Sequence, residues 1–287
     1  METLLNIRRA QPADIEACGR ICYEAFTTLN NQHNFPPDFP SADAAIEVIS
    51  TMFTHPGFFC LVAEQDGRII GSNCMDERSS IAGIGPITVD STAQNRSAGR
   101  QLMLAIMDRA AERRFPGLRL VQAAFHCRSM ALYAKLGFDI REPLVVMQGS
   151  PIRQVPSSYV VRPAKTEDLD ACNALCTRIH GHNRSGELSD ATAHGTACVV
   201  ERDGRITAYA SSAGFFGHTV AENNSALQAL LGGVNEFSGP GILVPTRNTA
   251  LFRWCLDHGL RVVEPMTLMT VGLYNEPGGA YLPSILY

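Results

Sequence analysis

The chain has 287 residues, of which 45% are hydrophobic and 18% charged, which is enough apolar material for two packed domains and too much for a disordered protein. The net charge of −4 argues against a general nucleic-acid binder, which needs a basic face to neutralise phosphates. No apolar run approaches the roughly 20 residues that span a bilayer, the N-terminus lacks a signal-peptide pattern, and nine cysteines without a CxxC pair suit reduced thiols, so we expect a cytoplasmic protein with no membrane partner.

A strand followed by a helix is expected at the start of the chain. Asp14 or a neighbour begins the helix, and the apolar residues between Ile15 and Cys22 fall on one of its faces. Cys18 and Cys22 are one helical turn apart, a spacing that can hold a metal ion, but no histidine or second cysteine pair accompanies them. We therefore interpret them as small core residues, and we expect the polar stretch 28–43 to form a loop.

A β-hairpin is predicted next. Residues 59–63 and 69–74 have the composition of strands, and the dipeptide Asp66-Gly67 separates them. Asp-Gly between two apolar runs is a strong signal for a tight hairpin turn.

A strand, a short loop and a helix follow in the pattern of a phosphate site. The strand ends at Val89, the loop is rich in small residues, and the sequence becomes helical from Gly99. Backbone N–H groups converge at a helix N-terminus and the helix dipole favours negative charge there. Arg96 and Arg100 are placed to add charge-assisted hydrogen bonds to phosphate oxygens.

This loop resembles the pyrophosphate-binding motif of the GCN5-related N-acetyltransferase (GNAT) superfamily, in which Gln/Arg-x-x-Gly-x-Gly/Ala follows a strand. Ser97 stands where the family has its first glycine, and this replacement strains the loop only if the φ angle there is positive. The resemblance implies that the backbone of Ile87, Thr88 and Val89 binds the pantetheine arm and the acetyl group. It also implies that the pyrophosphate is bound by Gln94, Asn95, Arg96, Ser97, Ala98, Gly99 and Arg100.

A second resemblance lies downstream, where the family has Asn-x-x-Ala-x-x-x-Tyr on a helix followed by Gly-Phe. This chain has His126, Ser129 and Tyr133 in those places, followed by Gly137-Phe138. The resemblance implies that all three side chains adjoin the cofactor and that Tyr133 gives a proton to the departing CoA thiolate, as a phenol with a pKa of about 10 can. The alternative is an ordinary half-buried helix tyrosine, which the position of Tyr133 relative to the loop and to Gly137-Phe138 disfavours.

An acceptor amine must lose a proton before it attacks a thioester, so a general base is expected. The candidates are Asp76 and Glu77, after the third strand, and His126. Each has an alternative interpretation: residues 76–78 as an exposed loop with a local ion pair, and His126 as a side chain that hydrogen-bonds the backbone.

The second half of the chain repeats the first. Three segments recur in the same order, which indicates a duplication. The matching pairs are 7–22 with 161–176, 60–69 with 198–206, and 137–143 with 259–265.

The duplication predicts two domains of one fold. We expect a GNAT domain at 1–149, a linker at 150–158 rich in proline and serine, and a GNAT-like domain at 159–287. The fold class is α/β (α+β), with two tandem acyl-CoA N-acyltransferase domains that each have a mixed, mostly antiparallel sheet flanked by helices.

The second half has lost the features that carry the chemistry. Asn248 stands at the family's asparagine position, but Cys255 replaces the tyrosine, and no glycine lies near the corresponding helix start. Glu222 is expected to repel a pyrophosphate. His180 and His182 have no third ligand nearby, so we interpret them as part of a surface loop rather than a metal site.

The sequence therefore predicts an enzyme that transfers an acetyl group from acetyl-CoA to a primary amine of a small acceptor, with no metal. The alternatives are an acyl-CoA sensor without turnover, which Ser97 and His126 favour, and an interaction scaffold that has lost the cofactor. A Rossmann fold is disfavoured because no Gly-x-Gly-x-x-Gly occurs. We expect a monomer with pseudo-dimeric halves or a homodimer, and we expect residues 28–43 to select the acceptor.

Overall fold

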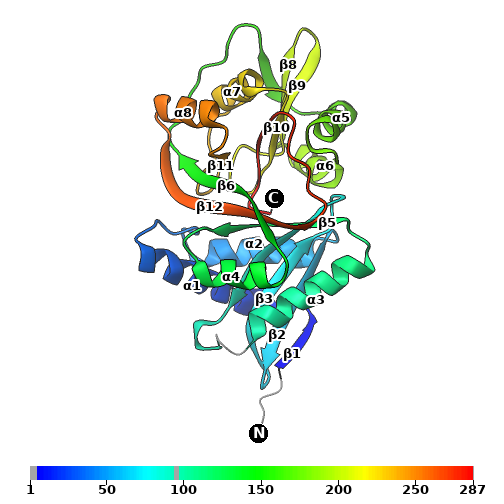
Figure 1. The fold of residues 1–287 in the computed structure, drawn as a ribbon, viewed down its shortest axis with the longest axis vertical. Coiled ribbons are helices and arrows are strands. Elements are labelled where there is room, and N and C mark those ends of the chain that lie inside the picture. Colours follow the sequence, from blue (N-terminus) through cyan, green and yellow to red (C-terminus); the bar gives the residue numbers. More distant parts are fainter. Residues whose placement is uncertain (1–4, 94–96, 287) are drawn as a thin grey trace. The chain divides into compact units, whose positions relative to one another are not determined.

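The structure is a computed structural model that describes residues 5–93 and 97–286 (Figure 1). The chain forms two compact units, each described here by itself. Unit 1 holds the residues up to Glu77, residues 81–118 and Leu286, and unit 2 holds residues 78–80 and 119–285. Within the described ranges, no helix combines the length and the apolar character needed to cross a bilayer.

Unit 1 contains an antiparallel sheet with the strand order β1-β2-β3-β4. Its elements are β1 (Leu5–Arg9), α1 (Ile15–His33), α2 (Ala42–Thr54), β2 (Phe58–Gln65), β3 (Arg68–Asp76), β4 (Ala82–Val89) and α3 (Ala98–Glu112).

The helices of unit 1 cover opposite faces of this sheet. Cys18 and Cys22 of α1 pack with Val62 of β2, so these cysteines are core residues as predicted. On β3, Asn73 donates a hydrogen bond to Met103 Sδ of α3 at 3.4 Å. Ser72 pairs with Val62 in the sheet, and successive residues of a strand point to opposite faces. Helices α1 and α2 therefore lie on one face and α3 lies on the other.

The predicted hairpin turn and the predicted start of the first helix are confirmed. Asp66 and Gly67 have φ angles of 52° and 75°, the left-handed pair that a two-residue hairpin requires. Asp14 accepts a hydrogen bond from Gln11 N at 2.8 Å directly before α1 begins. The prediction of a loop over 28–43 is wrong at both ends, because α1 continues to His33 and α2 begins at Ala42.

Unit 2 contains two groups of hydrogen-bonded strands, one in the order β5-β12-β6-β11 and the other in the order β13-β10-β9-β8-β7. Its elements are β5 (Gly117–Ala123), α4 (Cys127–Lys135), β6 (Asp139–Gln148), β7 (Val160–Pro163), α5 (Leu169–His180), α6 (Ser185–Ala193), β8 (Cys198–Arg202), β9 (Arg205–Ala210), β10 (Thr219–Ala221), α7 (Asn224–Gly233), β11 (Ile242–Pro245), α8 (Thr249–Asp257), β12 (Arg261–Gly272) and β13 (Ala280–Leu282).

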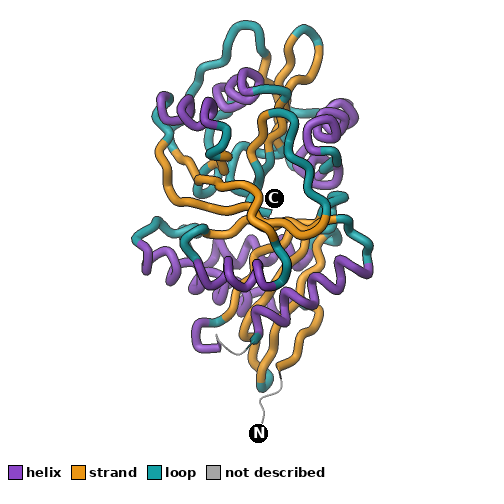
Figure 2. The backbone as a smooth tube through the Cα atoms, in the orientation of Figure 1, coloured by secondary structure: helices purple, strands orange, loops and turns teal. Residues whose placement is uncertain are grey.

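The two sequence halves exchange their last strands. β6, from the first half, lies between β12 and β11, and β12, from the second half, lies between β5 and β6 (Figures 1 and 2). The exchange is reciprocal: Ala124 N donates to Pro265 O and Thr246 N donates to Pro143 O, each at 3.0 Å. Because of this exchange, the compact units do not coincide with the two halves of the sequence. The domain limits at residues 149 and 159 were derived from the sequence repeat, and they stay a prediction.

The duplication also appears in the structure as a repeated ion cluster. Arg8 contacts Asp14 at 2.7 Å and Glu64 at 2.9 Å, and Arg162 contacts Asp168 at 2.7 Å in the same manner. In each half, hydrogen bonds from the arginine lower the pKa of the aspartate, which holds the start of the first long helix against the first strand.

Candidate functional site

Helix α3 begins at the predicted phosphate loop, and among the described residues no side chain caps its N-terminus. Ser97 is the residue that precedes the helix, and its side chain makes no capping hydrogen bond to the first turn. Ala98 is buried, Gly99 is half-buried and Arg100 is exposed on that turn. The predicted ligands Gln94, Asn95 and Arg96 lie outside the described residues. Backbone N–H groups of a first turn that no side chain caps are suited to an anion.

Ser97 has the left-handed backbone that the family's glycine would take freely. Its φ angle is 66°. A residue with a Cβ pays roughly 1–2 kcal/mol for this conformation, so the replacement of glycine by serine strains the loop. Strain of this kind is concentrated at functional sites, where the surrounding structure holds it.

We expect Ser97→Gly to raise the free energy of unfolding by roughly 0.5–1 kcal/mol, because relief of the left-handed strain exceeds the entropy that glycine loses on folding. Urea unfolding monitored by circular dichroism would measure the gain. Ser97→Ala is the matched control, since it removes the hydroxyl and keeps the strain. An equal gain in both variants would show that the hydroxyl, and not the φ angle, is the source.

In both halves, an acidic residue directly follows the strand that precedes the helix, β4 in the first half and β10 in the second. Asp90 forms an ion pair with Arg68 and accepts from Thr92 N at 2.8 Å, and although burial opposes it, the bonds from Thr92 and Arg68 lower the pKa of this carboxyl. Glu222, at the same place after β10, pairs with Arg205. An acid paired with the hairpin arginine therefore occurs in each half, and the repulsion of a pyrophosphate by Glu222 stays a prediction.

Helix α4 brings together His126, Ser129 and Tyr133. Ser129 Oγ lies 2.7 Å from His126 Nδ1, and Ser129 precedes Tyr133 by one helical turn. Tyr133 is only 6% exposed, and burial raises its pKa to about 12. Gly137, at a φ of 92°, ends the helix and turns the chain so that Phe138 packs 6.2 Å from the tyrosine ring.

Of the predicted bases, Glu77 is tied to helix α3. Its two carboxylate oxygens accept from Arg109 Nε at 2.8 Å and Arg109 Nη2 at 3.2 Å, and the side chain is 12% exposed. The interpretation of residues 76–78 as an exposed loop with a local ion pair is wrong, because Asp76 is buried at the end of β3 and Glu77 pairs with Arg109 of α3. Both carboxylate oxygens of Glu77 are thus engaged by one guanidinium.

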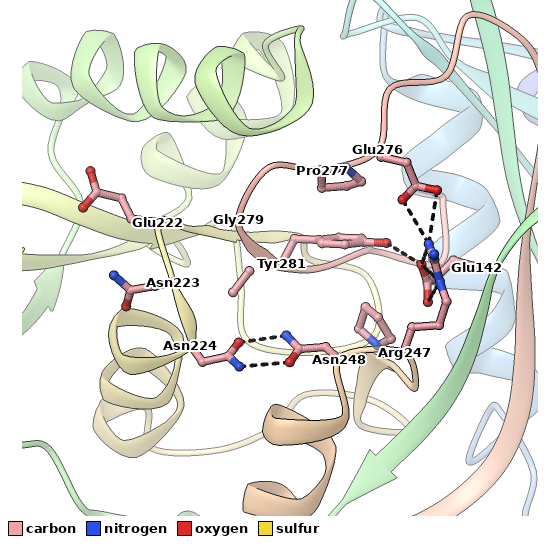
Figure 3. A pocket seen from close by; sticks show the side chains of 12 residues that line it. Glu142, Glu222, Asn223, Asn224, Arg247, Asn248, Glu276, Pro277, Gly279 and Tyr281 are labelled. Carbon is pink, nitrogen blue, oxygen red and sulfur yellow. Dashed lines mark hydrogen bonds and ion pairs between the residues drawn. The ribbon is translucent and has the colours of Figure 1, made fainter.

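The second half has a polar cavity of about 430 Å³ at the place that corresponds to the predicted cofactor site (Figure 3). It lies where β10 and β11 end and where α7 and α8 begin. Its lining consists of Glu142, Glu222, Asn223, Asn224, Pro245, Arg247, Asn248, Glu276, Pro277, Gly279, Ala280 and Tyr281.

The polar groups of this cavity bind one another. Arg247 contacts Glu142 at 2.6 Å and Glu276 at 3.0 Å. The amides of Asn224 and Asn248 exchange two hydrogen bonds, of 2.9 and 2.8 Å (Figure 3).

Both helix N-termini at the cavity are closed by their own asparagines. Asn223 accepts from Ala226 N at 3.0 Å, and Asn248 accepts from Leu251 N at 3.3 Å. Only residues 222 and 223 separate β10 from α7, whereas residues 90–97 separate β4 from α3. The second half therefore has neither a phosphate loop nor an open helix terminus at the corresponding place.

The expectation of a surface loop at His180 and His182 is wrong. These side chains are 5% and 8% exposed, and burial lowers the pKa of His182 to about 4. His180 packs on Tyr281, which lies a hundred residues further along the chain, so the local sequence gives no sign of this burial. Among the described residues, no three His, Cys, Asp or Glu side chains converge as metal ligands would.

The family model described as "Acetyltransferase (GNAT) family" matches residues 23–138, which include β4, α3 and α4. A putative acetyltransferase from Pyrococcus horikoshii shares this fold over nearly the whole chain, with a TM-score of 0.72, 19% identity, and coverage of 98% of this chain and 94% of that one. Residues 23–138 therefore match a GNAT domain. The match to this family supports acyl transfer as the activity.

The GNAT arrangement extends through both halves. A GCN5-related N-acetyltransferase from Sphaerobacter thermophilus is similar with a TM-score of 0.63 and 15% identity, over 95% of this chain and 96% of that one. A tandem GNAT protein from the clavulanic acid biosynthesis pathway is similar with a TM-score of 0.57 and 14% identity, over 94% of this chain and 98% of that one. At these identities the likeness concerns the fold. No curated protein sequence matches this one.

Proposed function

We propose that this tandem GNAT protein transfers an acetyl group from acetyl-CoA to the primary amine of a small acceptor. The observation that carries the proposal is the contrast between its halves. In the first half, residues 90–97 separate β4 from α3, no described side chain caps α3, and a buried tyrosine lies on α4. The second half has a two-residue connection, capped helices and Cys255 in place of the tyrosine.

The residues of the first half fit acetyl-CoA as the acyl-donor substrate. The first turn of α3 would hold the pyrophosphate through the N–H groups of Ala98, Gly99 and Arg100, with the arginine charge beside them. Ile87, Thr88 and Val89 would present backbone groups to the pantetheine arm. Tyr133 would then protonate the departing thiolate, since its raised pKa keeps the phenol protonated at neutral pH.

Several groups are candidates for the general base. Both carboxylate oxygens of Glu77 are engaged by Arg109, and Asp76 and His126 are the other candidates from the sequence. The strand exchange adds Glu264 of β12, a buried carboxylate that corresponds to Glu142 in the lining of the second-half cavity. Such a base would come from the second half of the chain and act in the site of the first.

A non-catalytic acyl-CoA sensor is the second candidate, and the strained Ser97 is the observation that favours it. Titration calorimetry with acetyl-CoA, combined with thiol release across a panel of primary amines, separates the two. We expect micromolar binding and amine-dependent thiol release. Binding of acetyl-CoA without thiol release for any amine would favour the sensor over the enzyme. Absence of acetyl-CoA binding would contradict both candidate functions.

A further inference from the structure

Gln122 of β5 is a polar residue in the interior of unit 2. It is 6% exposed, and within residues 5–93 and 97–286 neither its amide oxygen nor its amide nitrogen has a hydrogen-bond partner. Most buried polar side-chain atoms in native proteins are hydrogen-bonded, and an amide buried without partners lowers the stability of the fold. Gln122 therefore holds a donor and an acceptor that the described residues leave unused.

The side chain of Gln122 points away from the apolar cluster around Val121. Val121 and Leu243 hold the same place in the two halves and are buried in one cluster, against which Ala123 also packs. Successive residues of a strand point to opposite faces. Gln122, between Val121 and Ala123, therefore lies on the other face of β5.

The duplication identifies the helix that covers this other face. Gln122 corresponds to Val244 of β11, at the same spacing as Tyr133 and Cys255. Val244 and Cys255 of α8 are fully buried in one apolar cluster. Because Cys255 stands in the place of Tyr133, the repeat puts Gln122 on the face of β5 that carries α4 and the tyrosine.

We propose that Gln122 binds the pantetheine arm of acetyl-CoA through its side-chain amide. The proposal rests on the proposed function, which brings the thioester sulfur to Tyr133. The nearest amide of the arm is separated from that sulfur by only two methylene groups, so a side chain on the same face as the tyrosine is in position to meet it. The amide of the arm has one N–H and one C=O, which complement the oxygen and the nitrogen of Gln122.

The contrast between the halves supports a role in binding rather than in packing. The second half fills the same place with Val244, which has no polar side-chain atom. The core therefore does not need a glutamine there. The amide occurs in the half that keeps the tyrosine, and valine occurs in the half that has Cys255. An amide that is already held in place needs little ordering when a ligand binds, and the ligand supplies the missing hydrogen bonds.

The test uses Gln122→Met in the full chain, because methionine keeps the length of the side chain and removes both polar atoms. We expect the Kd for CoA to rise roughly tenfold, since the amide of the arm would be buried without its partner. We expect the melting temperature of the ligand-free protein to rise by roughly 2–4 °C, since the unpaired amide is gone. Titration calorimetry and scanning calorimetry measure the two changes. A glutamine that only supports the fold would lower the melting temperature when it is replaced.

Two controls locate the effect. The nucleotide half of CoA, 3′-phospho-ADP, lacks the arm and should bind Gln122→Met as tightly as the wild type. Val244→Thr introduces a hydroxyl at the same place in the second half, and it should lower the melting temperature without changing the Kd for CoA.

The role of Gln122 fails by itself if the Kd for CoA is unchanged in Gln122→Met or if the melting temperature of that variant falls. Equal losses of affinity for CoA and for its nucleotide half, or an equal loss in Val244→Thr, would also overturn it. Absence of CoA binding by the wild-type protein would overturn the proposed function as well, so the two failures are distinguishable.

Discussion

Replacing Gly99 by glutamate should abolish acetyl-CoA binding and leave the protein folded. Gly99 lies in the first turn of α3, where its backbone is helical, and an acidic side chain near a helix N-terminus is itself favourable for the helix. The same carboxylate would lie within about 4 Å of a bound pyrophosphate. Repulsion of about 4 kcal/mol at that distance corresponds to a loss of about a thousandfold in affinity. Titration calorimetry measures it, with circular dichroism to verify folding.

The duplication supplies a matched control for this change. Ser225 occupies the same place in the first turn of α7 and is exposed. We expect Ser225→Glu to leave acetyl-CoA affinity unchanged, because α7 has no phosphate loop before it and Asn223 caps its N-terminus. If Gly99→Glu and Ser225→Glu weakened binding equally, the pyrophosphate would not lie at α3.

Tyr133→Phe should lower kcat by about a hundredfold or more, the usual contribution of a general acid, while the Kd for acetyl-CoA changes little. Phenylalanine keeps the ring that packs against Phe138 and removes only the hydroxyl, so the helix should stay in place. Steady-state kinetics and calorimetry on the same preparation separate the two effects.

Cys255→Ala is the corresponding control in the second half, since Cys255 is the buried residue at the place of the tyrosine in α8. It should keep the full rate. A large loss of affinity in Tyr133→Phe, with kcat preserved, would make Tyr133 a binding or structural residue.

The sequence predicted the parts of the site that depend on local chemistry. The Asp66-Gly67 turn, the end of β4 at Val89 and the start of α3 within one residue of Gly99 all follow from neighbouring residues. From the sequence, strain at Ser97 could be predicted only as a condition on its φ angle, which is 66° in the structure.

What the sequence could not predict depends on contacts between distant segments. β6 and β12 have the same pattern, so nothing local tells which of them pairs with β5. The burial of His180 depends on Tyr281, and the ion pair of Glu77 depends on Arg109.

The exchange of last strands has a symmetry that bears on how such a chain arises. Leu144 of β6 faces Met266 of β12, which holds the same place in the second half, and the neighbouring pairs interchange across this point as Pro143–Thr267 and Val145–Pro265. A surface that meets its own copy in this way is isologous, as in a two-fold dimer.

Two separate copies of such a half would pair through the same strands, and their concentration would set the fraction that is paired. The connecting segment 150–158 replaces that concentration by a fixed local one. Once the copies are joined, each needs only the strand of the other, so the second copy can lose its loop and its tyrosine without any cost to the pairing. Loss of chemistry in one half and retention of its shape are thus compatible outcomes of the same fusion.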